Sequence, residues 1–134
     1  MNLLIDTHVF AWIFIEPRRF SSKARKFLED IKSNHFFFSD ASAWEASIKF
    51  GLGKLKLPET PEVFFPDRVR RAGYSHLPID LSHVTRVYSL PRLHGDPFDR
   101  LLISQAKVEG MTIISDDPMF GRYGVDSLRL RDIS

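Results

Sequence analysis

The sequence predicts an α/β fold, a three-layer α/β/α arrangement with a central parallel sheet. Short apolar runs alternate with helical patterns along the 134 residues. The runs that we expect as strands are residues 3–5, 36–38, 77–79, 112–114 and 125–128. Each is short and largely apolar, as is typical of parallel strands that are buried on both faces. Right-handed crossovers between such strands place the intervening helices over the sheet.

A helical pattern follows Ser21, whose hydroxyl can cap the start of a helix. Ala24, Phe27, Leu28 and Ile31 then recur at helical spacing. This pattern predicts an amphipathic helix that covers the first two strands.

A second apolar stripe follows the second strand and consists of Ala41, Trp44 and Ile48. We expect this stripe to face the core. Residues 61–71 and 81–88 are expected to form two further helices.

The clearest helix start in the chain is the pair Asp96 and Pro97. Aspartate is a favoured N-cap, and proline is favoured at the first helical position. Gly110 ends this helix just before the fourth strand. We find no repeat, linker or low-complexity tract, so residues 1–134 are expected to form a single domain.

The composition is that of a globular protein, with 43% hydrophobic and 13% aromatic residues. The absence of cysteine excludes disulfides and thiolate metal sites. The N-terminus has no signal-peptide pattern, and no apolar run approaches the roughly 18 residues of a membrane span. We therefore expect a soluble, cytoplasmic protein. Its net charge of +2 is too small to indicate a partner.

Four acidic residues stand where a strand should end or a helix should begin: Asp6, Glu45, Asp99 and Asp117. In open α/β sheets, ligands bind beyond the carboxyl ends of the strands, where the strand order reverses. Carboxylates from distant segments can meet there, and a shared cation offsets their repulsion. Singly, the aspartates also fit roles as helix caps, dipole partners or turn formers. Glu45 fits such roles least well, since it lies in the middle of a helix.

An all-oxygen ligand set favours Mg²⁺ or Mn²⁺ over Zn²⁺, because the chain has no cysteine and no paired-histidine zinc motif. Thr7 and Ser115 lie next to, or two residues before, the key aspartates and can orient them. Of the five scattered histidines, His94 lies two residues before the candidate acid Asp96 and can lie close to the site.

Taken together, these motifs resemble those of PIN-domain nucleases, and specifically of VapC-like toxins of type II toxin–antitoxin modules. The segments that carry the resemblance are residues 4–8, residues 42–45 with 48–49 and 53–55, residues 94–102 and residues 115–117. Its most specific parts are Trp44-Glu45 and Asp96-Pro97-Phe98-Asp99-Arg100. The resemblance covers nearly the whole chain and implies a PIN-like fold.

The resemblance places the metal-binding and catalytic carboxylates on Asp6, Glu45, Asp99 and Asp117, with Asp96 as an additional acidic position. The family usually has Thr-x-Asp at the last motif. Here Ser115 replaces the threonine, and Asp116 fills the variable position beside Asp117. Either Asp116 or Asp117 can therefore face the metal, and we favour Asp117, with Thr7, Ser115 and Asp116 in supporting roles.

The function that the resemblance implies is a Mg²⁺- or Mn²⁺-dependent endoribonuclease, which hydrolyses RNA phosphodiesters with metal-activated water. It also implies a cognate antitoxin partner and a homodimer. Two alternatives stay open: a stand-alone PIN nuclease in RNA processing, and a catalytically silent module that binds a basic partner peptide.

Six large apolar residues in two short stretches are expected to contribute to an antitoxin-binding surface near the acids. They are Phe10, Trp12, Phe14, Phe50, Leu52 and Leu55. We expect about half of them to belong to the ordinary core. The others would form a groove for an amphipathic antitoxin segment, with a basic residue reaching the acids.

Overall fold

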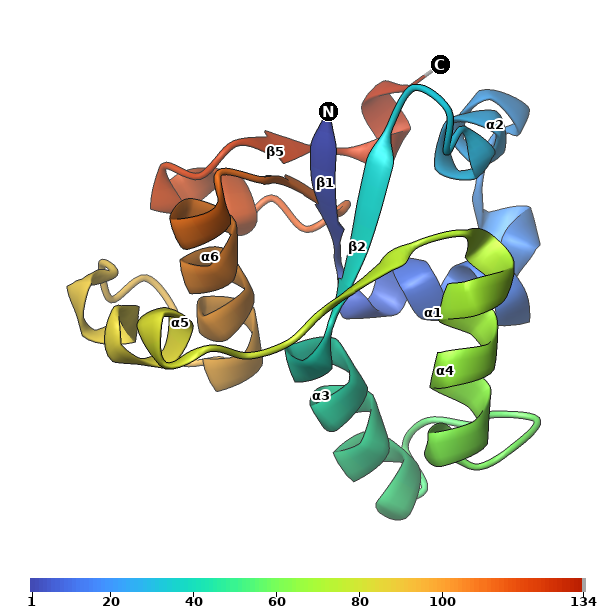
Figure 1. The fold of residues 1–134 in the computed structure, drawn as a ribbon, viewed down its shortest axis with the longest axis horizontal. Coiled ribbons are helices and arrows are strands. Elements are labelled where there is room, and N and C mark those ends of the chain that lie inside the picture. The colour runs from blue at the N-terminus through green and yellow to red at the C-terminus, as the bar shows by residue number, and fades with distance from the viewer. Residues whose placement is uncertain (134) are drawn as a thin grey trace.

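A computed structural model of the chain describes residues 1–133 and shows a central parallel sheet with helices on both faces (Figure 1). The strands are β1 (Asn2–Ile5), β2 (His35–Ser39), β3 (Ser75–Leu77), β4 (Thr112–Ile114) and β5 (Ser127–Leu128). The helices are α1 (Thr7–Ile15), α2 (Ser22–Glu29), α3 (Asp40–Gly51), α4 (Pro61–Ala72), α5 (Leu81–Thr85) and α6 (Pro97–Glu109). The α/β fold class predicted from the sequence is confirmed.

The order of the strands in the sheet is β3-β2-β1-β4-β5, and all neighbouring pairs are parallel. The chain builds the sheet outward from β1 through β2 to β3, and then returns to add β4 and β5 on the other side of β1. The strand order therefore reverses at β1 and β4, which is where an open α/β sheet forms its ligand crevice.

Figure 1 shows α1, α2 and α4 on one side of β1 and β2, and α5 and α6 on the other. Alternating residues of β1 belong to the two hydrophobic cores, one on each face of the sheet. Leu3 and Ile5 belong to the core that also contains Phe10 and Phe64, and Leu4 belongs to the core that also contains Leu102 and Ile103. All three β1 residues are fully buried, because helices cover both faces of this central strand.

Two strands differ from the sequence-based expectation in where they lie. The third strand covers Ser75–Leu77 instead of residues 77–79. Pro78 follows it directly, and proline has no N–H to continue a ladder. The fifth strand is only Ser127–Leu128, since a turn at Gly124, which has φ of 72°, precedes it.

Two expected apolar stripes also differ. Helix α3 buries Ala41, as expected, but Trp44 and Ile48 are 56% and 42% exposed. Its buried face carries Ser42, Glu45 and Ala46 instead. Ile31 lies beyond the end of α2 and is half-exposed.

The expected apolar surface is split among three environments. Phe10 is fully buried and packs on Phe38, with ring centroids 4.4 Å apart. Leu52 is exposed, and the other four residues of the set are half-buried. The set thus does not form one continuous groove, because Phe10 belongs to the core. Within residues 1–133, no helix has both the length and the apolar character needed to cross a membrane.

We predict that Phe10→Ala lowers the free energy of unfolding by about 3–5 kcal/mol, because it leaves a cavity beside Phe38. Tyr88→Ala is the matched control, since Tyr88 is 88% exposed. It should change that free energy by less than about 0.5 kcal/mol. Urea unfolding followed by circular dichroism measures both. Equal losses for the two variants would contradict this assignment of the core.

Candidate functional site

Asp6 occupies the junction between β1 and α1 and is 6% exposed. Its Oδ2 accepts a hydrogen bond of 2.7 Å from the Ser115 hydroxyl at the end of the neighbouring strand β4. Burial raises the pKa of the Asp6 carboxyl to about 6. The charges of Glu45 and Asp117 act in the same direction, and the Ser115 hydrogen bond opposes them.

Ser115 links two of the candidate acids. Besides donating to Asp6, its hydroxyl accepts a 3.0 Å hydrogen bond from the backbone N–H of Asp117. The serine is 1% exposed, so its geometry is fixed by packing. Ser115 thus joins two of the candidate acids, and its supporting role at a metal site stays a prediction.

Asp116 and Asp117 point in different directions. Asp116 accepts a 3.0 Å hydrogen bond from the backbone N–H of Arg131 and lies 3.9 Å from that guanidinium. Asp117 instead contributes to the electrostatic field at Asp6. Asp117 Oδ1 also accepts a 2.9 Å hydrogen bond from the backbone N–H of Met119. Asp116 therefore contacts the C-terminal segment, and the preference for Asp117 as the metal-facing residue stays a prediction.

Glu45 projects from the second turn of α3 and is 3% exposed. Its Oε2 lies 2.8 Å from Lys49 Nζ, one turn further along the helix. Its charge acts on both Asp6 and Asp99. The helix therefore directs a buried carboxylate toward acids from β1 and α6.

Asp96 and Asp99 lie at the start of α6. Asp96 Oδ1 accepts hydrogen bonds from the backbone N–H groups of Phe98 and Asp99, at 2.9 and 3.0 Å, so Asp96 is the predicted N-cap. The pKa of the Asp99 carboxyl is raised to about 6. Burial is the largest cause of this rise, and the charge of Asp96 is the second largest. The more distant charges of Asp6 and Glu45 add to this rise.

His94 contacts the candidate acids through the Asp99 carboxylate. Its Nε2 lies 3.2 Å from Asp99 Oδ2, and its Nδ1 pairs with the Tyr123 hydroxyl. Arg100 Nη1 donates to the same hydroxyl at 3.3 Å. This chain of hydrogen bonds holds one side of the Asp99 carboxylate and opposes the rise in its pKa.

Thr7 contacts Asp6 through its backbone, and this hydrogen bond opposes the rise in the pKa of Asp6, while the expected supporting role of Thr7 stays a prediction. Its hydroxyl donates to Ser42 Oγ at 2.8 Å and so joins α1 to α3. Sequence reasoning missed Lys49, although its position four residues after Glu45 is the spacing at which helical ion pairs form.

The candidate acids Asp6, Glu45, Asp99 and Asp117 thus influence one another across four segments of the chain, with Asp96 beside Asp99. The carboxylate oxygens of these acids lie further apart than the potential ligand atoms of a second group of residues. In that second group, three such atoms lie within 4.8 Å of one another. Among residues 1–133 that group is Asp80, His83 and Glu109. There the His83 ring bonds to the Asp80 N–H and lies 2.9 Å from Glu109, so it fixes α5 to the end of α6.

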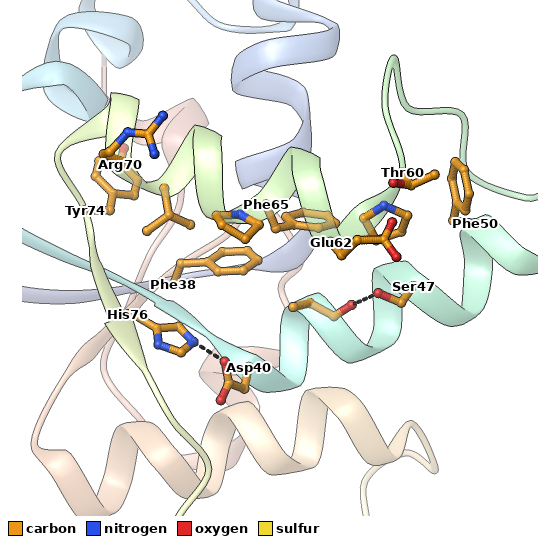
Figure 2. Close-up of a pocket in the computed structure, with 14 residues that line it drawn as sticks. Phe38, Asp40, Ser47, Phe50, Thr60, Glu62, Phe65, Arg70, Tyr74 and His76 are labelled. Carbon is orange, nitrogen blue, oxygen red and sulfur yellow. Dashed lines mark hydrogen bonds and ion pairs between the residues drawn. The ribbon is translucent and has the colours of Figure 1, made fainter.

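A cavity of about 940 Å³ opens between α3 and α4 (Figure 2), and none of the candidate acids is among its lining residues. Phe38, Phe50, Phe65 and Tyr74 line it, and the Asp40–His76 pair stands at one end. Of the six apolar residues expected near the site, Phe50 is the one among its lining residues.

Comparison with known proteins identifies the family to which the chain belongs. A family model described as PIN domain matches residues 3–126, nearly the whole chain. The chain belongs to the PIN-domain family. A segment of 62 residues of this PIN domain is 42% identical to Ribonuclease VapC16 of Mycobacterium tuberculosis. That segment spans 46% of this chain and only 43% of the relative.

Solved structures share the fold of this PIN domain. VapBC2 of Rickettsia felis, bound to a DNA fragment from its promoter, aligns with a TM-score of 0.74 and 18% identity, over 96% of this chain and 98% of that one. DNA-bound VapBC of Salmonella typhimurium gives 0.74 and 16%, over 97% and 98%. FitAcB of Neisseria gonorrhoeae gives 0.59 and 19%, over 96% and 98%. The resemblance to VapC-like PIN domains is confirmed, and these structures support the fold.

We predict that Asp6→Asn stabilises the metal-free PIN domain, and does so more at pH 7.5 than at pH 4. The folded protein raises the pKa of Asp6 from 3.8 to about 6, so wild-type stability is lost as pH rises through this window. A shift of this size corresponds to about 3 kcal/mol at pH 7.5. Asparagine has the same shape, retains an acceptor for Ser115 and carries no charge.

Urea unfolding in EDTA at both pH values measures this difference. Asp116→Asn is the control, because Asp116 bonds to the Arg131 backbone and is not one of the acids that repel Asp6. An Asp6→Asn variant that is less stable than wild type at pH 7.5 would contradict the prediction.

Proposed function

We propose that residues 1–134 form a single nuclease domain, a Mg²⁺- or Mn²⁺-dependent endoribonuclease that acts in the cytoplasm as the toxin of a toxin–antitoxin pair. The observation that carries the proposal is the mutual approach of buried carboxylates beyond the reversal in strand order. Asp6 and Glu45 are both less than 10% exposed. Burial of two like charges side by side destabilises a fold unless a cation joins them.

RNA is the proposed substrate because the chain shares the PIN-domain family with a relative named as a ribonuclease. The match to that relative includes less than half of its length, so the activity is a proposal for this chain. The proposed reaction is hydrolysis of an RNA phosphodiester.

The donor set fits a small, hard divalent cation. Asp6, Glu45, Asp99 and Asp117 would hold it through carboxylate oxygens, with Asp96 beside them, and such ligands suit Mg²⁺ and Mn²⁺. When bound, the ion supplies positive charge to the phosphate and to the attacking water. Modest rotation of the acidic side chains is required, since their oxygens are not grouped as closely as ligands around one ion.

The chain's own residues hold these acids in orientation. Ser115 Oγ donates to Asp6 and receives the Asp117 N–H, so two acids share one buried hydroxyl. His94 holds Asp99 from the side, and Asp96 fixes the first turn of α6. Such preorganised partners keep acidic ligands in place while substrate binds.

We predict that Asp117→Asn lowers RNA cleavage by about 100-fold or more, because it removes a negative ligand from the site. The neighbouring change Asp116→Asn should alter the rate by less than about threefold, since Asp116 contacts Arg131. EDTA should abolish the activity, and Mn²⁺ or Mg²⁺ should restore it.

Cleavage of a labelled single-stranded RNA, followed over time, measures these rates. Unchanged circular dichroism spectra establish that both variants fold. Full activity in excess EDTA would overturn the metal-dependent mechanism, and equal losses for both variants would overturn the assignment of Asp117.

The partner that we propose is an antitoxin. The structural neighbours from Rickettsia and Salmonella are described as VapBC bound to DNA. The cavity between α3 and α4, described above, is an open groove that supplies a suitable surface. Phe38, Phe50 and Phe65 give this groove an apolar lining that an amphipathic segment can cover (Figure 2). Phe50 also belongs to the surface expected from the sequence.

We predict that Phe50→Glu weakens binding of the antitoxin at least tenfold, because it places a charge in the apolar groove. Val63→Glu is the control, since Val63 lies on α4, is 52% exposed and is not among the residues that line the groove. The partner tested is the small protein encoded next to this gene, in a quantitative pull-down. If wild type retains no such protein, the stand-alone nuclease gains over the toxin.

A homodimer also belongs to the proposal. Trp44 and Ile48 on α3 and Leu52 just beyond its end recur every four residues and are 56%, 42% and 64% exposed. Such a stripe is apolar surface that a second copy of the chain would cover. Trp44 packs edge-to-face on Phe98, with ring centroids 4.8 Å apart, so the stripe extends to α6.

A further inference from the structure

Lys49 lies against the buried carboxylate of Glu45. Its Nζ is 2.8 Å from Glu45 Oε2 and 3.5 Å from His8 Nε2. The Lys49 side chain is 37% exposed, whereas that of Glu45 is 4% exposed. One end of this ion pair is therefore fixed in the protein, and the other reaches solvent.

The ion pair belongs to the same electrostatic system as the candidate acids. The charge of Glu45 acts on Asp6 and Asp99, and both of these carboxyls have a raised pKa. A buried carboxylate beside like charges needs a compensating cation. Lys49 provides one from the next turn of the same helix.

The position of Lys49 has a second consequence. Its ammonium contacts one of the oxygens that a divalent ion would need from Glu45, and it repels such an ion. Lysine carries a compact charge on a flexible four-carbon stem, so a half-exposed lysine can leave the carboxylate without any backbone movement.

We propose that Lys49 is an internal counter-ion that competes with the divalent cation for Glu45. In the metal-free chain it stabilises the acidic site, and a metal ion binds only after displacing the ammonium from the carboxylate. Lys49 is thus a positioning residue that sets metal affinity. The inference rests on the proposed function for the presence of a metal at these acids.

Two measurable effects of opposite sign follow from this single contact. Removal of the Lys49 charge leaves Glu45 unpaired, and this lowers the melting temperature in EDTA. The same removal eliminates a competitor and a repelling charge, and this tightens metal binding. A lysine with only a structural role would give the first effect without the second.

The test uses Lys49→Met, which retains length without charge, and Lys49→Arg, which retains the charge. Lys107→Met is the matched control, because Lys107 is an exposed lysine in the last turn of α6 and none of the ion pairs found in residues 1–133 includes it. Isothermal titration with Mn²⁺, in the absence of RNA, gives the dissociation constant. Thermal melting in EDTA gives the stability.

We expect Lys49→Met to bind Mn²⁺ about three- to tenfold more tightly than wild type, the scale of one partly screened charge. It should also melt several degrees lower in EDTA. Lys49→Arg should resemble wild type, and Lys107→Met should change neither value. Asp6→Asn, titrated in parallel, identifies the heat that belongs to the acidic site. Lys49→Gln replaces the methionine variant if that variant does not fold.

Equal or weaker Mn²⁺ binding by the uncharged Lys49 variants would overturn the inference. A wild-type chain that binds no Mn²⁺ would overturn both this inference and the proposed metal site. A wild-type chain that binds Mn²⁺ but cleaves no RNA would overturn only the proposed nuclease function, because the competition at Glu45 is measured without substrate.

Discussion

Burial of carboxylates at the carboxyl edge of the sheet imposes a large energetic cost on this fold, and repulsion among the acids adds to that cost. Asp6 and Asp99 come from segments more than ninety residues apart, and in both the folded protein disfavours the ionised form. Burial is the first cause in each case, and neighbouring acids add to it. The surrounding fold must supply enough stability to hold these groups where water is scarce.

That stability comes from the aromatic side of the sheet and from a set of buried hydroxyls. Phe10 of α1 packs on Phe38 of β2 with tilted rings, and Phe65 of α4 stacks on the same Phe38 at 5.4 Å, so α1 and α4 are fixed to β2. Closer to the acids, Ser39 caps α3 through the Ala41 N–H and also bonds to Gln105 of α6. Both helices that carry candidate acids are therefore tied to the end of one strand.

The central strands β1, β2 and β4 were predictable because their apolar runs are largely buried between the two helical layers, whereas the edge strands β3 and β5 were displaced or shortened relative to theirs. The face that α3 turns toward the core was not predicted correctly. Its apolar pattern favoured a core stripe at Trp44 and Ile48, but the helix buries Ser42 and Glu45 instead. Hydrophobic periodicity assumes that the buried face is apolar, and this assumption fails where a helix directs a carboxylate inward.

The candidate acids were chosen from their places at strand ends, and the structure brings them within electrostatic reach of one another. Their role as metal ligands stays a prediction. The preference for Asp117 over Asp116, made from the family resemblance, also stays a prediction, but the structure adds a contact of Asp116 that no local pattern contains. Arg131, fifteen residues further along, engages Asp116. The contact of Lys49 with Glu45 had a local signal, the spacing of four residues, but that spacing is common on exposed helices.

A fold alone does not establish a function, and the solved neighbours, at 19% identity or less, support only the fold. The energetic cost of the acidic residues differs between Asp96 and Asp6. Asp96 has a structural use, because its carboxylate caps α6. Asp6 accepts a hydrogen bond from Ser115 that an uncharged amide in the same place would also accept, yet it brings buried negative charge with it. A group that weakens the fold and that a neutral isostere would replace without loss of packing points to chemistry that needs the charge.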